Sequence, residues 1–290
     1  MNIISWLNGE FHDDTNLIDI GDRGFLLGDG LFETMLVIDG VPVFLSAHLA
    51  RMRAGAAALG IDVVLDQKTI AAAIKKLAAT NLGARDKASA RLTLTRGSGE
   101  RGLSVLKASS SPTLLLTLSA YSAPPVGSPV ALIISKHCRS ERSISSAHKT
   151  LNYLDNVLAR AEADANGAGD ALMLNSAGRV ACATAANFFI IRADGTVVTP
   201  PVSEGALPGI VRGILLSAGV SIGCNVNERA IELGDIDDSL VFLTNSLSGI
   251  MPASLPGKSS PLPNAQHVLE CLQSCYANEI RKSLERQAVI

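Results

Sequence analysis

The sequence has no excess of charge of either sign and is poor in charged residues altogether. It has 25 Lys and Arg against 27 Asp and Glu, a formal net charge of -2, and charged residues make up 18% of the chain. Soluble domains typically contain roughly 25% charged residues. Because there is also no basic run, the composition argues against a dedicated nucleic-acid-binding protein.

Long apolar runs and paired cysteine motifs are also missing. No stretch reaches the roughly 18 uninterrupted apolar residues of a membrane-spanning helix. The first residues, MNIISWLNGEFHDD, have no basic segment before an apolar one, as a secretory signal would. The cysteines are odd in number and form no CxxC, which indicates reduced thiols in a cytoplasmic protein and no metal site. They are Cys138, Cys182, Cys224, Cys271 and Cys275.

The length and the apolar content predict a two-domain protein. The chain has 290 residues, against roughly 150 per domain. Hydrophobic residues make up 47% and aromatic residues only 4%, so the core is mainly aliphatic. The segment AYSAPPVGSP contains three prolines and separates apolar runs. We therefore predict an N-terminal α/β domain over 1–120, a linker over 121–129 and a C-terminal domain over 130–290.

Local patterns predict mixed helices and strands. Asp39-Gly40 lies between two β-like runs over 31–46 and predicts a hairpin, as Asp194-Gly195 does over 187–200. Ser46 is a plausible N-cap for a helix that ends at Gly60. The other predicted helices are 66–80, 151–167, 207–219 and 264–287, and the other strands are 88–96, 112–121, 129–135, 170–175 and 239–245. The fold class is therefore α/β, of the α+β or mixed type.

One glycine motif is a poor match to its usual function. Gly97-Ser-Gly99-Glu-Arg-Gly102 fits GxGxxG and follows a predicted strand. A dinucleotide-binding fingerprint also needs a helix that opens at the third glycine, and LSVLKASSSP is too short and too polar for one. Arg96 and Arg101 flank the glycines. Two guanidinium groups on such a loop suit a carboxylate-bearing substrate, and a solvated hairpin tip is the alternative.

Lys149 stands out by its isolation. It is the only lysine between Lys136 and Lys258 and precedes an apolar helix. A lysine nucleophile reacts as the free amine, so it needs partial burial to lower its pKa. A solvated lysine at a helix start is the ordinary alternative.

Several segments taken together resemble one enzyme family. They are DRGFLLGDGLFET (22–34), HLAR (48–51), KTLNYLDNVLA (149–159), GRVACATAANF (178–188) and LPGIVR (207–212). In this order and spacing they resemble the class IV (fold type IV) pyridoxal-phosphate enzymes over about residues 3–253. This family holds branched-chain aminotransferases, D-amino-acid aminotransferases and 4-amino-4-deoxychorismate lyases.

The resemblance implies a two-domain fold with a smaller N-terminal α/β domain and a larger, barrel-like C-terminal domain. It implies pyridoxal 5'-phosphate as the cofactor, in a cleft between the domains. It also implies a homodimer in which loops of the partner subunit close the site.

The resemblance also implies roles for individual residues. Lys149 matches the lysine that holds the cofactor as a Schiff base and moves protons at the reacting carbon. Arg51 matches the phosphate-binding arginine, whose planar fork suits a phosphate. Backbone amides at a helix start suit the same group, and the matching residues there are Gly209, Ile210 and Val211.

Four more positions match cofactor contacts in the family. Thr244 and Ser246 match a hydroxyl-bearing phosphate loop. Leu207 matches the residue packed on the cofactor ring. Tyr153 matches the tyrosine that reaches the phenolic oxygen of the cofactor in branched-chain enzymes.

One position departs from the family pattern. Cys182 stands where the family normally has a glutamate that pairs with the pyridine nitrogen and keeps it protonated. Protonation makes the ring an electron sink, and a thiol with a pKa of about 8.5 holds that proton less well. The sequence does not show where two candidate carboxylates, Asp170 and Glu204, lie relative to Cys182.

Three functions follow from these observations. The first is a transaminase acting through Lys149 on an amino acid and a 2-oxo acid, although Phe32-Glu-Thr differs from the FEG-I-R of branched-chain enzymes. The second is aminodeoxychorismate lyase, with Thr34 as the proton donor. The third is an impaired or non-catalytic homologue, because of Cys182. Phe32, Arg96 and Arg101 are the predicted substrate-binding residues, and the substrates are small molecules in each enzymatic case.

Overall fold

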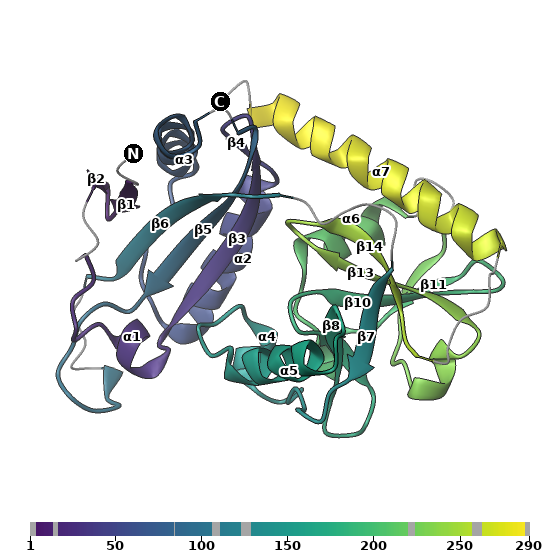
Figure 1. Ribbon diagram of the computed structural model, residues 1–290. Coiled ribbons are helices and arrows are strands. Elements are labelled where there is room, and N and C mark those ends of the chain that lie inside the picture. Colours follow the sequence, from purple (N-terminus) through teal and green to yellow (C-terminus); the bar gives the residue numbers. More distant parts are fainter. Residues whose placement is uncertain are drawn as a thin grey trace. The chain divides into compact units, whose positions relative to one another are not determined.

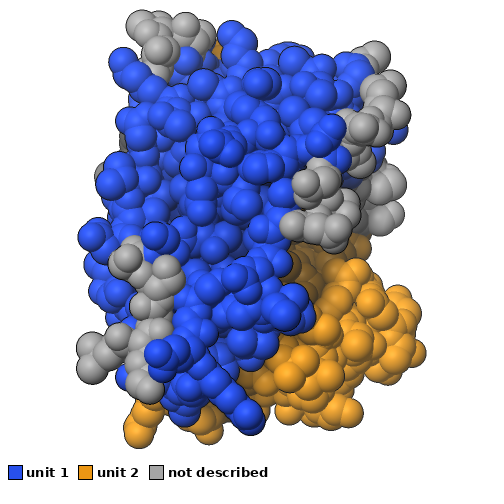
Figure 2. All heavy atoms as spheres, turned by 90° about the vertical axis from the view of Figure 1, so that its left-hand side faces the viewer, with its two compact units in different colours: residues 1–123, 148–152, 282–290 blue, residues 124–147, 153–281 orange. Residues whose placement is uncertain are grey.

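The computed structural model describes residues 4–13, 17–83, 85–105, 111–122, 129–219, 224–256 and 263–287. The chain divides into two compact units, which Figure 2 colours separately. Unit 1 contains residues 1–123, 148–152 and 282–290, and unit 2 contains residues 124–147 and 153–281. Residues 123–128 of the predicted linker lie outside the described residues, so the predicted domain boundary stays a prediction.

Unit 1 contains one six-stranded sheet, in the order β2-β1-β6-β5-β3-β4. Neighbouring strands are antiparallel throughout. The helices α2 and α3 pack on β3 and β6 (Figure 1). The elements are β1 (Ser5–Leu7), β2 (Glu10–His12), α1 (Arg23–Leu27), β3 (Gly30–Ile38), β4 (Val41–Pro42), α2 (Leu45–Leu59), α3 (Gln67–Asn81), β5 (Lys87–Thr95) and β6 (Thr113–Ala120).

The hairpin between β3 and β4 turns at Asp39-Gly40 as predicted, but its second strand is only Val41–Pro42 and does not extend to residue 46. Asp39 and Gly40 both have positive φ, at 50° and 77°, which is the backbone that a tight two-residue hairpin turn requires. The following helix is different from its prediction at its start. Ser46 is not the N-cap, because α2 begins at Leu45 and its N-cap is Phe44. The Phe44 amide donates to the Ser283 hydroxyl at 2.8 Å, so a residue distant in sequence satisfies this helix end.

Unit 2 contains one eight-stranded sheet, in the order β12-β11-β10-β13-β14-β7-β8-β9. The Ala183 amide at the end of β9 donates to the Ala186 carbonyl just before β10 at 2.9 Å. The sheet therefore curls back on itself, in agreement with the expected barrel-like domain. Its strands are β7 (Val130–Ile134), β8 (Asp170–Leu174), β9 (Val180–Ala183), β10 (Asn187–Arg192), β11 (Val197–Thr199), β12 (Val226–Glu228), β13 (Ser239–Asn245) and β14 (Gly249–Ser254).

Two helices of unit 2, α5 and α6, begin later than the sequence predicts. The predicted helix 151–167 begins only at Leu154, because the Leu151 amide bonds to the Gly30 carbonyl and keeps that segment extended. The predicted helix 207–219 begins at Ile210, after the N-cap Gly209. The helical elements are α4 (Ile144–Ala147), α5 (Leu154–Ala165), η2 (Val202–Glu204), α6 (Ile210–Ala218), η4 (Leu233–Ile236) and α7 (Pro263–Gln287), whose last residues, from 282 on, belong to unit 1.

The two cores are mainly aliphatic, as the composition predicts, with three buried phenylalanines in unit 2. In unit 1, side chains of β3, β5 and β6 pack against α2 and α3 around the buried residues Met35, Leu49 and Leu77. In unit 2 the core lies on the sheet around Phe188, Ile190 and Leu243. Within the described ranges, no helix combines the length and the apolar content that crossing a bilayer requires.

Candidate active site

Lys149 lies in an extended segment that pairs with the start of β3. Its carbonyl oxygen accepts a hydrogen bond from the Phe32 amide at 2.9 Å, and the Leu151 amide donates to the Gly30 carbonyl at 3.0 Å. Between these two hydrogen bonds, Leu31 and Thr150 form an isolated antiparallel bridge. The backbone of Lys149 is therefore fixed on both sides, and its side chain is half-buried.

Two cations lie against the ring of Phe32. The Lys149 Nζ is 4.1 Å from the ring centroid, and the guanidinium carbon of Arg91 is 3.9 Å from it. Thr34 is two residues further along β3, on the same face of the sheet as Phe32, and pairs with Arg91 of β5. The structure thus places Lys149 against Phe32, and it places Thr34 on the same face of β3 as Phe32.

Arg91 is a candidate functional residue that sequence reasoning missed. It lies in the strand RLTLT, where its alternation with apolar residues indicates an ordinary solvent-facing side chain. Only the pairing of β5 with β3 places its guanidinium beside the ring that Lys149 also touches.

Glu33 points to the opposite face of β3, toward α2. Its side chain is 1% exposed. Arg51 donates from Nε to one carboxylate oxygen at 2.7 Å and from Nη2 to the other at 2.6 Å. His48 Nδ1 lies 2.6 Å from the second oxygen. The predicted phosphate-binding Arg51 is therefore one member of a buried three-residue cluster.

The charges of this cluster follow from its burial. Burial raises the pKa of Glu33, but the hydrogen bonds from Arg51 and His48 outweigh it and lower this pKa to about 2. Burial lowers the pKa of His48, and Arg51 and Lys149 add to this, against the influence of Glu33. His48 is thus neutral at pH 7, and its Nδ1 carries the proton because a carboxylate only accepts. Among the described residues its Nε2 has no hydrogen-bond partner.

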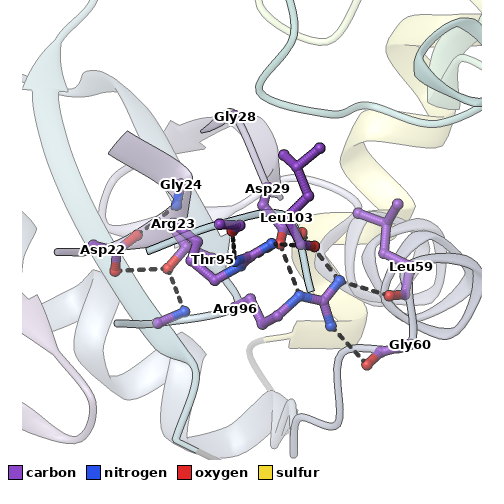
Figure 3. A network of polar contacts seen from close by, with 12 residues as sticks. Asp22, Arg23, Gly24, Gly28, Asp29, Leu59, Gly60, Thr95, Arg96 and Leu103 are labelled. Atoms are coloured by element: carbon purple, nitrogen blue, oxygen red, sulfur yellow. Dashed lines mark hydrogen bonds and ion pairs between the residues drawn. The ribbon is translucent and has the colours of Figure 1, made fainter. Parts of the chain in front are cut away.

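Arg96 belongs to a second network of unit 1, shown in Figure 3. Asp29 accepts from Arg23 Nε at 2.9 Å and from Arg96 Nε at 2.8 Å. Arg96 also donates to the carbonyl oxygens of Leu59 and Gly60 at the end of α2. In the structure Arg96 thus joins the end of β5 to the end of α2, and its role in substrate binding stays a prediction.

The first glycine of the loop after Arg96 is required by the backbone conformation and by the space around it. Gly97 has a φ of +84°, and a Cβ there would collide with the Ser111 carbonyl. Residues 101–103 form bends rather than the first turn of a helix. Arg101, the second predicted substrate-binding arginine, is exposed.

In unit 2, a helix start and a buried hydroxyl point to an anion site. Gly209 is the N-cap of α6, and a Cβ there would collide with the Asn187 side-chain oxygen. Asn187 pairs across β10 and β13 with Thr244, and α6 packs against β13. Thr244 is 1% exposed, and its Oγ1 has no partner among the described residues.

This arrangement suits a phosphate. The first turn of α6 carries no acidic side chain, so its amides and the helix dipole favour an anion. Ile210 and Val211 are the first two residues of the helix, and Leu207 accepts from Asn187 Nδ2 at 2.8 Å. Ser246 lies in the turn after β13.

Cys182 is a buried, neutral thiol. It lies on β9 opposite Met173 of β8 and is 5% exposed. Burial raises the pKa of the thiol, an effect that Arg139 opposes and Asp170 reinforces. At pH 7 this side chain is therefore protonated and can donate only weakly.

The cation beside Cys182 has neutral partners. Arg139 is 6% exposed and donates to the carbonyl oxygens of Gly205 and Ser146, at 2.7 and 3.0 Å, and to the Asn156 side-chain oxygen at 3.2 Å. Asn156 lies on α5, whose N-cap is Tyr153.

The two carboxylates that the sequence could not place have other partners. Asp170 accepts from the Thr184 hydroxyl at 2.5 Å and from the Thr184 amide at 3.2 Å. Glu204 pairs with Arg179 at 2.7 Å. Each is already used within unit 2.

Comparison with known proteins agrees with the motif resemblance. The sequence profile described as "Amino-transferase class IV" matches residues 30–255. A putative branched-chain-amino-acid aminotransferase of Methanocaldococcus jannaschii is 34% identical over 85% of each chain. A D-alanine aminotransferase of Bacillus licheniformis is 27% identical over 92% of this chain and 94% of its own.

The chain is also similar to a solved structure that is described as a lyase. The structure of a putative 4-amino-4-deoxychorismate lyase of Legionella pneumophila has a TM-score of 0.80 and 32% identity. The match covers 90% of this chain and 96% of that one. The chain therefore belongs to the class IV aminotransferase family, and the expectation of an enzyme with this two-domain fold is confirmed.

Proposed function

We propose that this protein is a pyridoxal-phosphate-dependent transaminase that moves an amino group between an amino acid and a 2-oxo acid. The placement of Lys149 carries the proposal. Its backbone is paired to β3, and its Nζ lies 4.1 Å from the Phe32 centroid. A fixed, half-buried amine suits a lysine that forms a Schiff base and exchanges protons. The cofactor, when bound, supplies an aldehyde that condenses with amines and a ring that withdraws electrons.

The residues fit the phosphate end of this cofactor. In unit 2 the Thr244 hydroxyl, which has no partner within the described part of the chain, and the amides of the first turn of α6 supply donors for an anion. We propose that unit 1 supplies Arg51 for the same group. The proposed phosphate contacts are Arg51, Gly209, Ile210, Val211, Thr244 and Ser246, and the proposed ring contacts are Leu207 and Tyr153.

The residue proposed for the pyridine nitrogen fits less well. Cys182 is a neutral thiol, because burial raises its pKa, and the neighbouring Arg139 is a cation with neutral hydrogen-bond partners. A thiol beside a cation does not hold a proton on an adjacent nitrogen as a carboxylate does. This supports the alternative of an impaired or non-catalytic homologue, which the test below addresses.

The substrate side of the proposal rests on unit 1. Arg91 lies beside the ring that Lys149 contacts, where a guanidinium fork suits the carboxylate of an amino acid. Arg96 and Arg101 remain predicted substrate-binding residues.

The second candidate function is 4-amino-4-deoxychorismate lyase. Thr34 favours it, because it lies on the same face of β3 as Phe32. Its hydroxyl is a candidate for delivering a proton to the departing group. The similarity to the Legionella structure also supports this function.

We further propose a homodimer that acts on small molecules in the cytoplasm. Exposed apolar side chains on α1 of unit 1 support the dimer. All five cysteines lie in the described ranges and none forms a disulfide, which supports a reducing compartment.

The test is the visible absorbance of the protein with added pyridoxal phosphate. Wild type and Lys136→Ala, a change at an exposed lysine, should develop the band of a lysine-bound cofactor, and Lys149→Ala should not. An amino acid that discharges the band, with amino transfer to a 2-oxo acid, supports the transaminase. Pyruvate release from aminodeoxychorismate without a 2-oxo acid supports the lyase instead. A folded wild-type protein without a band would contradict both enzymatic functions.

A further inference from the structure

We infer that Glu33 is a positioning residue for phosphate recognition, because it fixes the orientation of the Arg51 guanidinium. The inference rests on the proposed function, in which Arg51 binds the cofactor phosphate. Neither the sequence motifs nor the roles carried over from the family assign a function to Glu33.

The geometry of the pair restricts the arginine to one orientation. Both carboxylate oxygens of Glu33 are engaged by Arg51, through Nε at 2.7 Å and Nη2 at 2.6 Å. Two parallel hydrogen bonds define the plane of a guanidinium as well as its position. An arginine held by one bond, or by a point charge, could rotate about its last side-chain torsions.

Glu33 is itself held in place. His48 Nδ1 donates to the same carboxylate at 2.6 Å, and His48 is completely buried. His48 and Arg51 are three residues apart on α2 and so lie on one face of the helix. The carboxylate of Glu33, on β3, is therefore held in place by a buried side chain of α2. Because Glu33 is fixed, the guanidinium of Arg51 that it binds is fixed as well.

The cluster also has an electrostatic cost for an anion. The negative charge of Glu33 offsets the positive charge of Arg51, which by itself weakens the attraction of Arg51 for a phosphate. If orientation dominates, removing the charge of Glu33 weakens phosphate recognition. If charge dominates, removing it strengthens recognition. The two accounts thus predict opposite signs for one substitution.

The test compares pyridoxal phosphate with pyridoxal, which lacks the phosphate. Apparent dissociation constants come from titration of the visible band of the lysine-bound aldehyde. Wild type should prefer pyridoxal phosphate. Glu33→Gln should reduce this preference by about tenfold or more, which corresponds to about 1.4 kcal/mol, with little change in the affinity for pyridoxal. Glu10→Gln, at an exposed glutamate of unit 1, is the matched control and should keep the wild-type preference.

A double-mutant cycle separates positioning from general destabilisation. Arg51→Lys keeps the charge but has no fork, and it should lose the same preference as Glu33→Gln. The double variant should lose no more than either single variant, because both remove one oriented group. Additive losses would overturn the inference.

Other outcomes are also decisive. A preference that is unchanged or increased in Glu33→Gln would overturn the positioning role. If Glu33→Gln does not fold, Arg51→Lys carries the test, and a wild-type preference in Arg51→Lys would overturn the inference. Wild-type protein that forms no band with either aldehyde would refute the proposed function itself. Equal wild-type affinity for both aldehydes, with a normal band, would refute only the phosphate role of Arg51.

Discussion

At the scale of single residues, Cys182 is where this chain departs from the chemistry that its family membership leads one to expect. The thiol is buried and neutral, and the carboxylates of Asp170 and Glu204 have other partners. Both of these carboxylates are thus already engaged within unit 2. If the cofactor binds as proposed, its ring nitrogen meets a weak donor.

Restoring a carboxylate should therefore accelerate the reaction. We expect Cys182→Glu to speed the discharge of the cofactor band by an amino acid about tenfold or more, since about 1.4 kcal/mol of added stabilisation gives that factor. The neighbouring Arg139 favours the ionised form of the new side chain. Stopped-flow absorbance measures the rate.

Cys182→Ser is the matched control, because it is small and neutral like the thiol. It should leave the rate close to that of wild type. If Cys182→Glu discharges no faster than Cys182→Ser in folded protein, the thiol is not what limits this step, and the assignment of Cys182 to the ring nitrogen fails.

At the scale of elements, the Glu33 cluster joins β3 to α2 and should make this junction sensitive to acid. Glu33 has a pKa of about 2 in the folded protein, against 4.5 ordinarily. Its contribution to stability is thus complete above pH 4.5 and is lost as the pH falls toward 2. His48, with a pKa below its ordinary 6.5, acts in the same direction, and its contribution begins to fall below pH 6.5.

We expect the free energy of unfolding to fall by about 3 kcal/mol between pH 4.5 and pH 2 through Glu33 alone. The Glu33→Gln variant should be less stable than wild type at neutral pH. Its free energy of unfolding should not show the decrease between pH 4.5 and pH 2 that Glu33 causes. Denaturant titrations at a series of pH values measure both effects, with Glu10→Gln as the control. Equal pH slopes for wild type and Glu33→Gln would show that Glu33 is not the titrating group.

The elements also show what local sequence can predict. The hairpin at Asp39-Gly40 and the strand 239–245 follow from signals within a few residues, and the structure confirms them. The start of α2 does not follow from local signals, because the amide of its N-cap Phe44 donates to the hydroxyl of Ser283, far away in the chain.

The same limit applies to the candidate site. The sequence motifs identify Lys149 and Arg51, but they do not identify the residues that surround these two side chains. Arg91 reaches Phe32 only through strand pairing, and Glu33 reaches Arg51 only through the packing of α2 on β3. The sequence predicts Arg96 as a cation of a loop, whereas in the structure it also donates to Asp29 and to the Leu59 carbonyl at the end of α2. Such contacts depend on tertiary structure, which the spacing of residues does not encode.

At the scale of the whole molecule, the exposed apolar surface of unit 1 is the feature that indicates an interface with a second copy of the chain. Phe25 on α1 is 77% exposed, and Leu26 and Leu27 follow it. Leu103 is 80% exposed, and its carbonyl accepts from Arg23 of α1, so it lies beside this helix. Arg23 is in turn fixed by Asp29 (Figure 3). Apolar side chains presented by a well-anchored segment are typical of an interface.

We therefore expect wild-type protein to be a dimer and Phe25→Asp to be a monomer with an unchanged circular dichroism spectrum. A charge buried without a partner in an interface opposes association. Val64→Asp is the matched control, because Val64 is 87% exposed in the same unit and belongs neither to α1 nor to the loop that carries Leu103, and it should remain dimeric. Sedimentation equilibrium gives the mass of each. A dimeric Phe25→Asp would place the interface elsewhere, and a monomeric wild type would refute the proposed homodimer, so the two parts of the prediction fail separately.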